Sequence, residues 1–585
     1  MIAFCLGGFA TFCHADIHYT VKYSGDKKLQ VSVEIPVTSA VTSLQSPNWG
    51  PGSYRLADNW QRLQDVHAFS DDGKEITTTK PNDYTWTIPT AGVKTLRFSY
   101  TESTGGRERF GDGTTDESVI HYSGPATYVY VVERKMEPCF LRLDLPEGWK
   151  VATGLTMKGG KYWAPTYDAF ADNPVTMGMY RELSYNAVGK KHILALYGVA
   201  KDDVDTDKLL KACSFISQME NDFFGNRPPY DHYVWHFNMT KRPDGGSGLE
   251  HLASTEITLA NGLGDGAIGV CAHEFFHLWN VKRIRSKVLG PFDYTKLPET
   301  GALWWLEGVT DYYAHQMMSR YGYWDDQHFY KTLLGQVATI RANENRLTVS
   351  PYDASFKVGL AANGRGNSNG FNISYYNLGF LLGFMLDTEI ISRTQGRRSL
   401  DDVELALWDL CKNDQPGFAE DEIRKQLIRF GGPDMGTIYD NWVMKPGELP
   451  VEAQLAKIGM AMNKVDRKIP SLGIIATPSL TRGFVVSKVS GAAEGKIMVD
   501  DLITEINGKA VTSTRTYNDA LRDLKEGDAV KVKITRGDKS SDIDLVMGST
   551  SRASFEIAPL AGASPEAARL REIFMYRGKK GWQPK

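Results

Sequence analysis

The pentapeptide His273-Glu274-Phe275-Phe276-His277 constrains the fold of this 585-residue chain more than any other segment. Apolar residues recur at helical spacing on both sides of it, so residues 266–280 are predicted to form a helix. Residues four apart share one face of a helix, which lets both imidazoles bind the same metal ion. Glu274 would then lean over the open coordination position. The alternative is a pair of helix histidines that bind nothing.

A zinc ion bound by such a pair needs a third protein ligand and a position kept for water. Segment 304–313 predicts a second, aromatic-rich helix, in which Glu307 follows His277 by 30 residues. Glu307 is the predicted third ligand. Asp311, one turn later on the same face, would orient an imidazole by accepting its second N–H, with an exposed helical carboxylate as the alternative. His315 is interpreted as structural.

Length and composition limit the classes of protein to which this chain can belong. At about 150 residues per domain the chain should hold three or four domains. Its apolar fraction of 42% and charged fraction of 23% exclude a disordered, collagen-like or membrane-embedded chain. With 67 Lys and Arg against 70 Asp and Glu, the net charge is −3, so nothing favours nucleic acid or an acidic membrane as partner.

Residues 1–15 contain no Lys, Arg, Asp or Glu, and Ala15 is a small residue at the position where a signal peptidase would cut. We predict a secretory signal, although the usual basic start is missing, and a buried N-terminal segment is the alternative. The run is too short for a membrane helix, which needs about 20 apolar residues. The predicted location is periplasmic or secreted.

Four cysteines follow the predicted signal, at widely separated positions: Cys139, Cys213, Cys271 and Cys411. Such spacing fits neither a CxxC metal site nor a disulfide-dense scaffold. We interpret them as isolated core thiols, with one long-range disulfide as the alternative in an oxidising compartment.

The chain is predicted to be a multidomain α+β protein. Short strands separated by turn residues predict a β-sandwich over 16–185. Residues 186–450 combine strands with helices that begin near 205, 266, 303, 325, 376, 400 and 421, and a Gly-rich loop is expected at 241–248. Residues 451–550 are rich in strands and hairpin turns, and 551–585 are predicted to be a helical tail.

Five segments together resemble the PDZ-containing glycyl aminopeptidase family of zinc metallopeptidases. They are 49–54 (Trp-Gly-Pro-Gly-Ser-Tyr), 248–251 (Gly-Leu-Glu-His), 273–285, 305–313 and 374–379 (Ser-Tyr-Tyr-Asn-Leu-Gly). The resemblance implies a thermolysin-like catalytic domain over 186–450 and a gluzincin mechanism, with Zn²⁺ held by His273, His277 and Glu307.

In such a mechanism the metal acidifies a water molecule and polarises the scissile carbonyl. Glu274 takes the water's proton and passes it to the leaving amine. A hydroxyl donor beside the metal would stabilise the oxyanion, and the spacing to Gly379 within the resemblance favours Tyr376. Tyr375 is the alternative donor. A third interpretation is that both tyrosines only pack against the start of a helix.

Glu250 distinguishes an aminopeptidase from an endopeptidase. We expect its carboxylate, in a loop before the edge strand, to bind the free α-amine of a peptide. The alternative is a carboxylate at the rim of the site that binds nothing. The resemblance implies a preference for N-terminal Gly or Ala. Two rival functions remain, a zinc endopeptidase with the same metal site and a non-catalytic adaptor that binds peptides through a PDZ domain.

Segment 483–548 resembles a PDZ domain, and 472–474 would be its carboxylate-binding loop, able to hold a peptide C-terminus added as a strand. The other expected partners are peptide substrates with a free N-terminus. A basic run follows the predicted zinc helix at Lys282, Arg283, Arg285 and Lys287. We interpret it as a solvated face or as pairs with acids inside the fold rather than as an anion site.

Overall fold

The computed structural model describes residues 16–104, 118–362, 373–412, 416–479 and 483–584. The predicted signal segment 1–15 lies outside them. The chain forms two compact units, one of residues up to 460 together with 560–585 and one of residues 461–559. The predicted domain boundaries near 186, 450 and 550 stay predictions.

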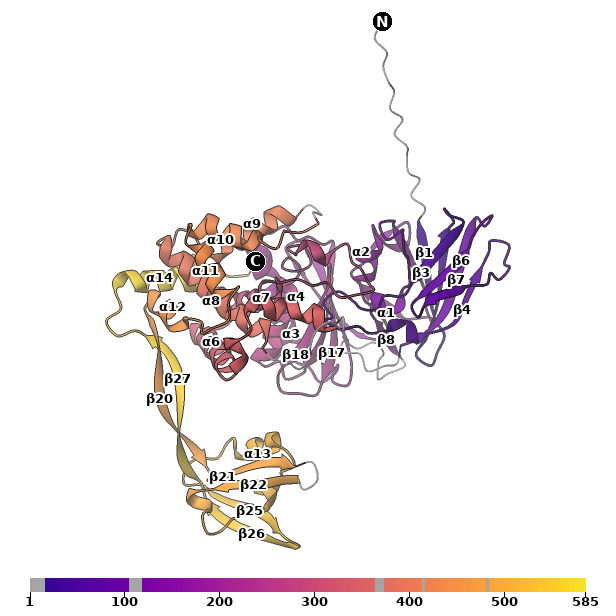
Figure 1. The fold of residues 1–585 in the computed structure, drawn as a ribbon. Coiled ribbons are helices and arrows are strands. Elements are labelled where there is room, and N and C mark those ends of the chain that lie inside the picture. The colour runs from indigo at the N-terminus through magenta and orange to yellow at the C-terminus, as the bar shows by residue number, and fades with distance from the viewer. Residues whose placement is uncertain (1–15, 105–117, 363–372, 413–415, 480–482, 585) are drawn as a thin grey trace. The chain divides into compact units, whose positions relative to one another are not determined.

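The first unit begins with a β-rich domain, indigo to purple in Figure 1. Its largest sheet has the order β12 (Thr156–Lys158), β13 (Lys161–Ala164), β10 (Cys139–Asp144), β1 (Ile17–Tyr23), β2 (Lys28–Pro36), β7 (Thr95–Ser103), β4 (Leu63–Phe69). A second sheet has the order β5 (Thr79–Asn82), β6 (Thr85–Pro89), β3 (Val41–Gln45), β9 (Tyr130–Val131). A third joins β11 (Lys150–Thr153), β14 (Val175–Gly178) and β8 (Val119–Tyr122).

Alternation of apolar and polar residues explains how these strands form a core. Along β2 every second side chain, from Leu29 to Ile35, is buried, as period-2 patterning requires. The inner faces of the two larger sheets meet through aromatic rings, with Trp86 of β6 and Phe98 of β7 5.8 Å apart. Two short helices, α1 (Gly124–Thr127) and α2 (Tyr167–Ala171), complete the domain.

A five-stranded sheet starts the region that is predicted to be catalytic. Its order is β15 (Arg181–Ala187), β16 (Lys190–Tyr197), β17 (His232–Thr240), β19 (Ser254–Ala260), β18 (Gly246–Glu250), with β18 antiparallel to β19 at one edge. Helices α3 (Thr206–Phe223) and α4 (Asp265–Phe276) pack together beside it.

Helix α4 is held by aromatic contacts on two sides. Phe275 stacks on Trp235 of β17 at 5.3 Å, and Phe276 stacks on Tyr313 at 5.0 Å. Asp244 accepts a hydrogen bond from the Ala267 amide at 2.7 Å and so satisfies a free N–H at the helix start. These contacts leave the remaining face of α4 for polar side chains.

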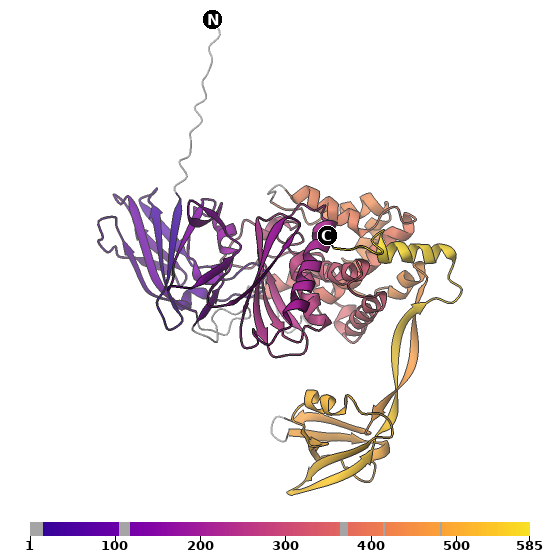
Figure 2. The same cartoon turned by 180° about the vertical axis from the view of Figure 1, so that it is seen from behind.

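Helices make up the rest of this unit, magenta to orange in Figures 1 and 2. They are a π-helical turn, η3 (Trp304–Val309), then α5 (Thr310–Arg320), α6 (Asp326–Arg341), α7 (Pro351–Ala362), α8 (Tyr375–Arg393), α9 (Leu400–Cys411), α10 (Glu422–Gly431), α11 (Met435–Trp442) and α12 (Val451–Lys457). Most were predicted, whereas α7, α11 and α12 were not.

The second unit is a small β-rich fold. Its main sheet has the order β21 (Ile474–Ser479), β22 (Gly483–Val489), β23 (Leu502–Ile506), β25 (Ala529–Arg536), β26 (Lys539–Val546), with β24 (Lys509–Ala510) on β23. Helix α13 (Thr514–Leu521) covers a core that includes Phe484 and Ile506. The long strands β20 (Met460–Ser471) and β27 (Gly548–Pro559) pair with each other, so the chain enters and leaves this unit side by side.

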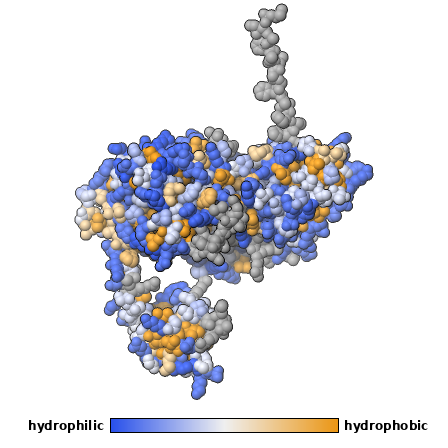
Figure 3. Space-filling model, viewed as in Figure 1, coloured by the Kyte–Doolittle hydropathy of each residue, from blue (hydrophilic) through white to orange (hydrophobic). Residues whose placement is uncertain are grey.

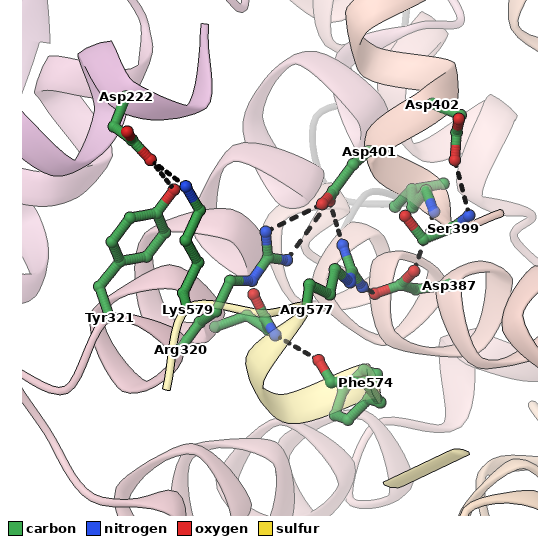
Figure 4. A network of polar contacts seen from close by, with 12 residues as sticks. Asp222, Arg320, Tyr321, Asp387, Ser399, Asp401, Asp402, Phe574, Arg577 and Lys579 are labelled. Carbon is green, nitrogen blue, oxygen red and sulfur yellow. Dashed lines mark hydrogen bonds and ion pairs between the residues drawn. The ribbon is translucent and has the colours of Figure 1, made fainter. Parts of the chain in front are cut away.

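After β27 the chain returns to the first unit as α14 (Pro565–Tyr576), which packs on α5 and α8. Arg577 binds both Asp387 and Asp401, and Arg320 binds Asp401 at 2.9 Å (Figure 4). Gln316 donates to the Phe574 carbonyl at 2.8 Å. The predicted helical tail is therefore anchored by a buried charge cluster.

The architecture is that of a multidomain α+β protein, as predicted. All four cysteines after residue 15 are buried thiols. None of the helices in the described ranges combines the length and apolar character that a bilayer crossing requires.

Candidate active site

Three side-chain atoms converge at the cleft face of α4. His273 Nε2 lies 2.9 Å from His277 Nε2, and Glu307 Oε2 lies 3.5 Å from the first and 3.2 Å from the second. Ligands bound tetrahedrally to zinc at about 2.0–2.1 Å are separated by about 3.3 Å. The spacing therefore fits a zinc ion at the centre of the three atoms.

Hydrogen bonding fixes which nitrogen of His277 is available. Its Nδ1 lies 2.7 Å from the carbonyl oxygen of Asn280, which accepts only, so Nδ1 carries the proton. Nε2 is then the ring nitrogen that faces His273 Nε2 and Glu307 Oε2, and in the neutral imidazole it offers a lone pair to a metal ion. Three such atoms need protons or a cation between them, and a metal ion satisfies all three at once.

The same Asn280 fastens the two ligand segments to each other. Its side-chain amide donates to the Trp305 carbonyl at 3.1 Å and to the Thr310 hydroxyl at 3.0 Å. The predicted helix 266–280 ends earlier than expected, at Phe276, because the chain turns here to bring Asn280 under the second ligand segment.

Glu307 lies on the π-helical turn η3 rather than on the regular helix that the sequence predicted. The cause is packing: a Cβ atom on Gly308 would lie 2.5 Å from the Cα of Gly379 on α8, so the two backbones touch. Burial acts to raise the pKa of Glu307, but the charge of His277 and hydrogen bonds from both imidazoles outweigh it and hold that pKa well below its usual range.

Glu274 lies in a cleft of about 410 Å³ that His273 also lines. It is 6% exposed, and its Oε2 has no hydrogen-bond partner among the described residues. Burial raises the pKa of this carboxyl to about 7. An orphaned carboxylate oxygen with a near-neutral pKa is suited to accept and release a proton.

Glu250 is the last residue of β18, which is itself the edge strand, so the predicted loop at 241–248 is wrong in its second half. Gly246 and Gly248 weaken the strand signal in the sequence. Gly248 is required there because a Cβ would lie 2.4 Å from the Glu274 carboxylate. The Glu250 carboxylate lies within 4.8 Å of a carboxylate oxygen of Glu274 and a ring nitrogen of His277.

Tyr375 and Tyr376 open helix α8 and both line the cleft. The ring of Tyr376 lies 5.9 Å from that of His273, and the two tyrosine rings stack at 4.8 Å. Burial and the charge of Glu307 raise the pKa of Tyr376 well above its usual range, so its hydroxyl keeps its proton.

Asp311 and His315 also border the cleft. Asp311 Oδ1 is 3.6 Å from His273 Nδ1, close to the predicted orienting position. His315 stacks on Trp324 at 5.5 Å, in keeping with its structural interpretation.

Tyr54 is a site residue that the sequence does not predict. Its hydroxyl, from the β-rich domain, donates to Glu307 Oε1 at 2.5 Å, and nothing in the pattern of segment 49–54 indicates a contact with a residue 253 positions away. Asn280 is likewise not predicted, because its carbonyl contacts His277 through the backbone and any residue type would supply that group.

The first two residues of the basic run make contacts inside the fold, whereas Lys287 is exposed. Lys282 is 6% exposed and pairs with Asp172 at 2.6 Å. Asp172 also faces His251 at 3.4 Å, and His251 faces Glu256 at 3.8 Å, which makes a buried cluster between the β-rich domain and β18–β19. Arg283 donates to backbone carbonyls of Pro229, Leu252 and Leu278.

Three models of known protein families match parts of this chain. Residues 18–179 match the model of the Peptidase M61 N-terminal domain, 266–382 that of M61 glycyl aminopeptidase, and 456–546 that of a PDZ domain. No curated protein gives a significant match.

Two solved structures illustrate the similarity. An aminopeptidase N family protein from Idiomarina loihiensis has 22% identity and a TM-score of 0.74, covering 96% of this chain and 100% of that one. An M1 zinc metallopeptidase mutant from Deinococcus radiodurans, bound to a Tyr-Ser-Ala substrate, has 14% identity and a TM-score of 0.46, covering 75% and 95%.

The fold and the family matches define a metallopeptidase, a hydrolase of peptide bonds. The N-terminal, catalytic and PDZ matches occur on one chain in this order, as expected for the PDZ-containing M61 glycyl aminopeptidase family. The chain is in general terms a zinc aminopeptidase.

Proposed function

We propose that the protein removes single residues from the free N-termini of peptides, with Zn²⁺ bound by His273, His277 and Glu307. The observation that carries the proposal is the position of Glu250. Its carboxylate lies within 4.8 Å of both Glu274 and His277, about one residue's length from the metal ligands.

The bound ion would supply Lewis acidity, which acidifies water and polarises the scissile carbonyl. Glu274 would accept the proton of the attacking water through its unpartnered Oε2 and then deliver it to the leaving amine. The Tyr376 hydroxyl, beside the His273 ring, would donate to the oxyanion of the tetrahedral intermediate.

Glu250 would bind the substrate's α-ammonium group. It is 5% exposed, so the ion pair would form in a largely desolvated position where opposite charges attract strongly. An acylated N-terminus has no charge to offer there, and a longer chain on that side would meet β18. Recognition at Glu250 thus favours cleavage after the first residue over internal cleavage.

Preference for N-terminal Gly or Ala is part of the proposal. The family match supports it. So does the close approach of the β-rich domain to the amine site, since a Cβ on Gly52 would lie 3.0 Å from the Glu250 carboxylate. Little room is left beside Glu250 for a large first side chain.

The test uses the purified chain with aminoacyl anilides, each with a free and an acetylated N-terminus. We expect hydrolysis of the free Gly and Ala compounds, loss of activity with a chelator and recovery with Zn²⁺. Glu250→Gln should retain zinc and lower kcat/KM on free substrates at least 100-fold, since it removes the charge that holds the amine.

Equal hydrolysis of free and acetylated substrates would favour the zinc endopeptidase. A chain that binds zinc stoichiometrically but hydrolyses neither would favour the non-catalytic adaptor. Glu250→Gln with unchanged hydrolysis of free substrates would make the assigned role wrong.

The PDZ unit is proposed to bind a peptide C-terminus along β21, an edge strand next to α13. Gly473 of the predicted carboxylate loop has a φ of +75°, and a Cβ there would lie 1.7 Å from the Ser490 carbonyl oxygen, so only glycine fits. Hydrophobic residues gather on the face of this unit that Figure 3 shows. Ile475, on β21, is 55% exposed. Periplasmic or secreted localisation remains a prediction from residues 1–15.

A further inference from the structure

Segment 48–54 of the β-rich domain extends onto the catalytic region and is fixed there at its start. The Asn48 amide donates to the Tyr294 carbonyl at 2.9 Å, and the Trp49 indole donates to the Asp293 carbonyl at 2.9 Å. The Trp49 ring also packs edge-on against Phe292 at 5.6 Å. The start of the segment is therefore attached to residues 292–294.

A tight turn at 50–53 directs the segment towards the cleft. The Ser53 amide donates to the Gly50 carbonyl at 3.0 Å. Pro51 and Gly52 are the second and third residues of this turn, and Gly52 has a φ of +89°, which is the pattern of a type II turn. A Cβ on Gly52 would lie 2.3 Å from Leu249 Cδ1. The turn thus lies directly against β18.

Tyr54 follows the turn and reaches the metal ligand. Its hydroxyl donates to Glu307 Oε1 at 2.5 Å, and its ring contacts Tyr375 edge-on at 6.0 Å. A tyrosine hydroxyl keeps its proton at neutral pH and a carboxylate oxygen only accepts, so Tyr54 is the donor. The other carboxylate oxygen, Oε2, is the one that faces His273 and His277.

We propose that Tyr54 is a positioning residue of the metal centre, through which the β-rich domain holds Glu307 with one defined oxygen towards the two histidines. The proposal rests on the proposed function only in its assignment of Glu307 as a zinc ligand.

The physical reason is that a carboxylate has two equivalent oxygens and rotates about its side-chain bonds. A hydrogen bond from a neutral hydroxyl to a carboxylate is charge-assisted and short, about 2.5–2.7 Å, and it restrains the group strongly. With Oε1 occupied, Oε2 is preorganised for the ion. Partners of this kind typically change metal affinity by about 10–100-fold.

The experiment measures the Zn²⁺ dissociation constant of the full chain by competition with a chromophoric chelator, without substrate. Tyr54→Phe removes only the hydroxyl, and we expect it to weaken Zn²⁺ binding about 10–100-fold. The visible absorption of the Co²⁺-substituted chain should shift as well, because the Glu307 ligand is no longer held in one orientation.

Tyr100→Phe is the matched control. Tyr100 is buried in the same domain and donates to the Thr127 carbonyl at 2.7 Å, away from the cleft. It should leave the Zn²⁺ affinity and the Co²⁺ spectrum unchanged. An equal loss of affinity in both variants would overturn the proposal, because it would report general destabilisation of the domain.

Wild-type affinity in Tyr54→Phe, with or without a fall in kcat, would also overturn it; a fall in kcat alone would indicate that the hydroxyl acts on the reacting carbonyl. The proposed function fails separately: a wild-type chain with Tyr54-dependent zinc affinity but no hydrolysis of free-amine substrates would contradict the aminopeptidase and support the positioning role. A wild-type chain with no zinc affinity would overturn both.

Discussion

Two buried clusters of charged side chains lie in the helical region, and they are built on different principles. At the C-terminal anchor Arg320, Arg577, Asp387 and Asp401 bring two cations to two anions (Figure 4). At the cleft three acceptor atoms, from His273, His277 and Glu307, point at one another. The first cluster is neutral as it stands, whereas the second needs a cation.

The difference separates a structural cluster from a reactive one. Asp387 also accepts from the Tyr312 hydroxyl and from the Leu400 amide at 2.9 Å, so both of its oxygens have partners. Glu274, in the cleft, has a buried oxygen with none among the described residues. Charged groups that pair with one another hold elements together, whereas an unpartnered carboxylate oxygen on a residue that lines a cleft is available to a ligand.

The largest expected effect comes from removing the unsatisfied carboxylate. Glu274→Gln keeps the side-chain shape but cannot accept a proton, so kcat/KM should fall about 10³–10⁴-fold, about 4 to 5.5 kcal/mol, at unchanged zinc content. Steady-state kinetics and metal analysis measure this.

Glu404→Gln is the matched control. Glu404 is buried and accepts from the Trp305 indole at 3.1 Å, and burial raises its pKa to about 8, so it is mostly neutral at pH 7. Its replacement should leave kcat unchanged. Unchanged hydrolysis in Glu274→Gln would contradict the general-base role.

The next largest effect should be on stability, at the satisfied cluster. Asp387→Ala leaves Arg577 buried with half of its charge compensation and should lower the free energy of unfolding by about 3–5 kcal/mol, while zinc content is unchanged. Urea denaturation measures it. Asp434→Ala breaks the exposed pair with Arg393 and should cost less than about 1 kcal/mol. An equal decrease in the free energy of unfolding in the two variants would contradict the distinction between buried and exposed pairs.

The cluster between the β-rich domain and β18 provides a pH test of the same idea. Burial lowers the pKa of His251, but hydrogen bonds and charge from Asp172 and Glu256 outweigh it and hold the pKa at about 9, above the usual value of about 6.5 for histidine. Because the pKa of His251 is higher in the folded than in the unfolded chain, its protonated form stabilises the fold fully below about pH 6.5. This contribution to the free energy of unfolding, about 3 kcal/mol at most, is lost as the pH rises to about 9.

Urea unfolding of the wild type between pH 6.5 and 9 should therefore show a decrease in stability that His251→Gln lacks. The same slope in both proteins would mean that other groups produce it and that His251 is neutral in the folded state.

The smallest effect should distinguish the two tyrosines. Tyr376→Phe removes the proposed oxyanion donor and should lower kcat about 100-fold, near 2.7 kcal/mol, with little change in KM. Tyr375→Phe, one residue away, should change kcat less than about 3-fold. The reverse result would assign the donor role to Tyr375.

Much of the site could be predicted because its signals are local. The spacing of His273 and His277 requires a helix, and the structure has one. The aromatic-rich segment around Glu307 was likewise predicted, but its π-helical turn was not, since that turn follows from the contact of Gly308 with Gly379 on another helix. Glu250 was identified by its motif and then assigned to the wrong element, because Gly248 looks like a loop residue until the Glu274 carboxylate is seen against it.

The amino-acid sequence by itself determined the residue types that carry the chemistry and their order along the chain, because a helix brings residues four apart together whatever surrounds it. Only the tertiary structure decided how they are held. The Asn280 carbonyl orients His277, Tyr54 reaches Glu307 across 253 positions, and Arg577 returns from the end of the chain to Asp387. Such contacts join distant segments through backbone atoms and packing, and no local spacing encodes them.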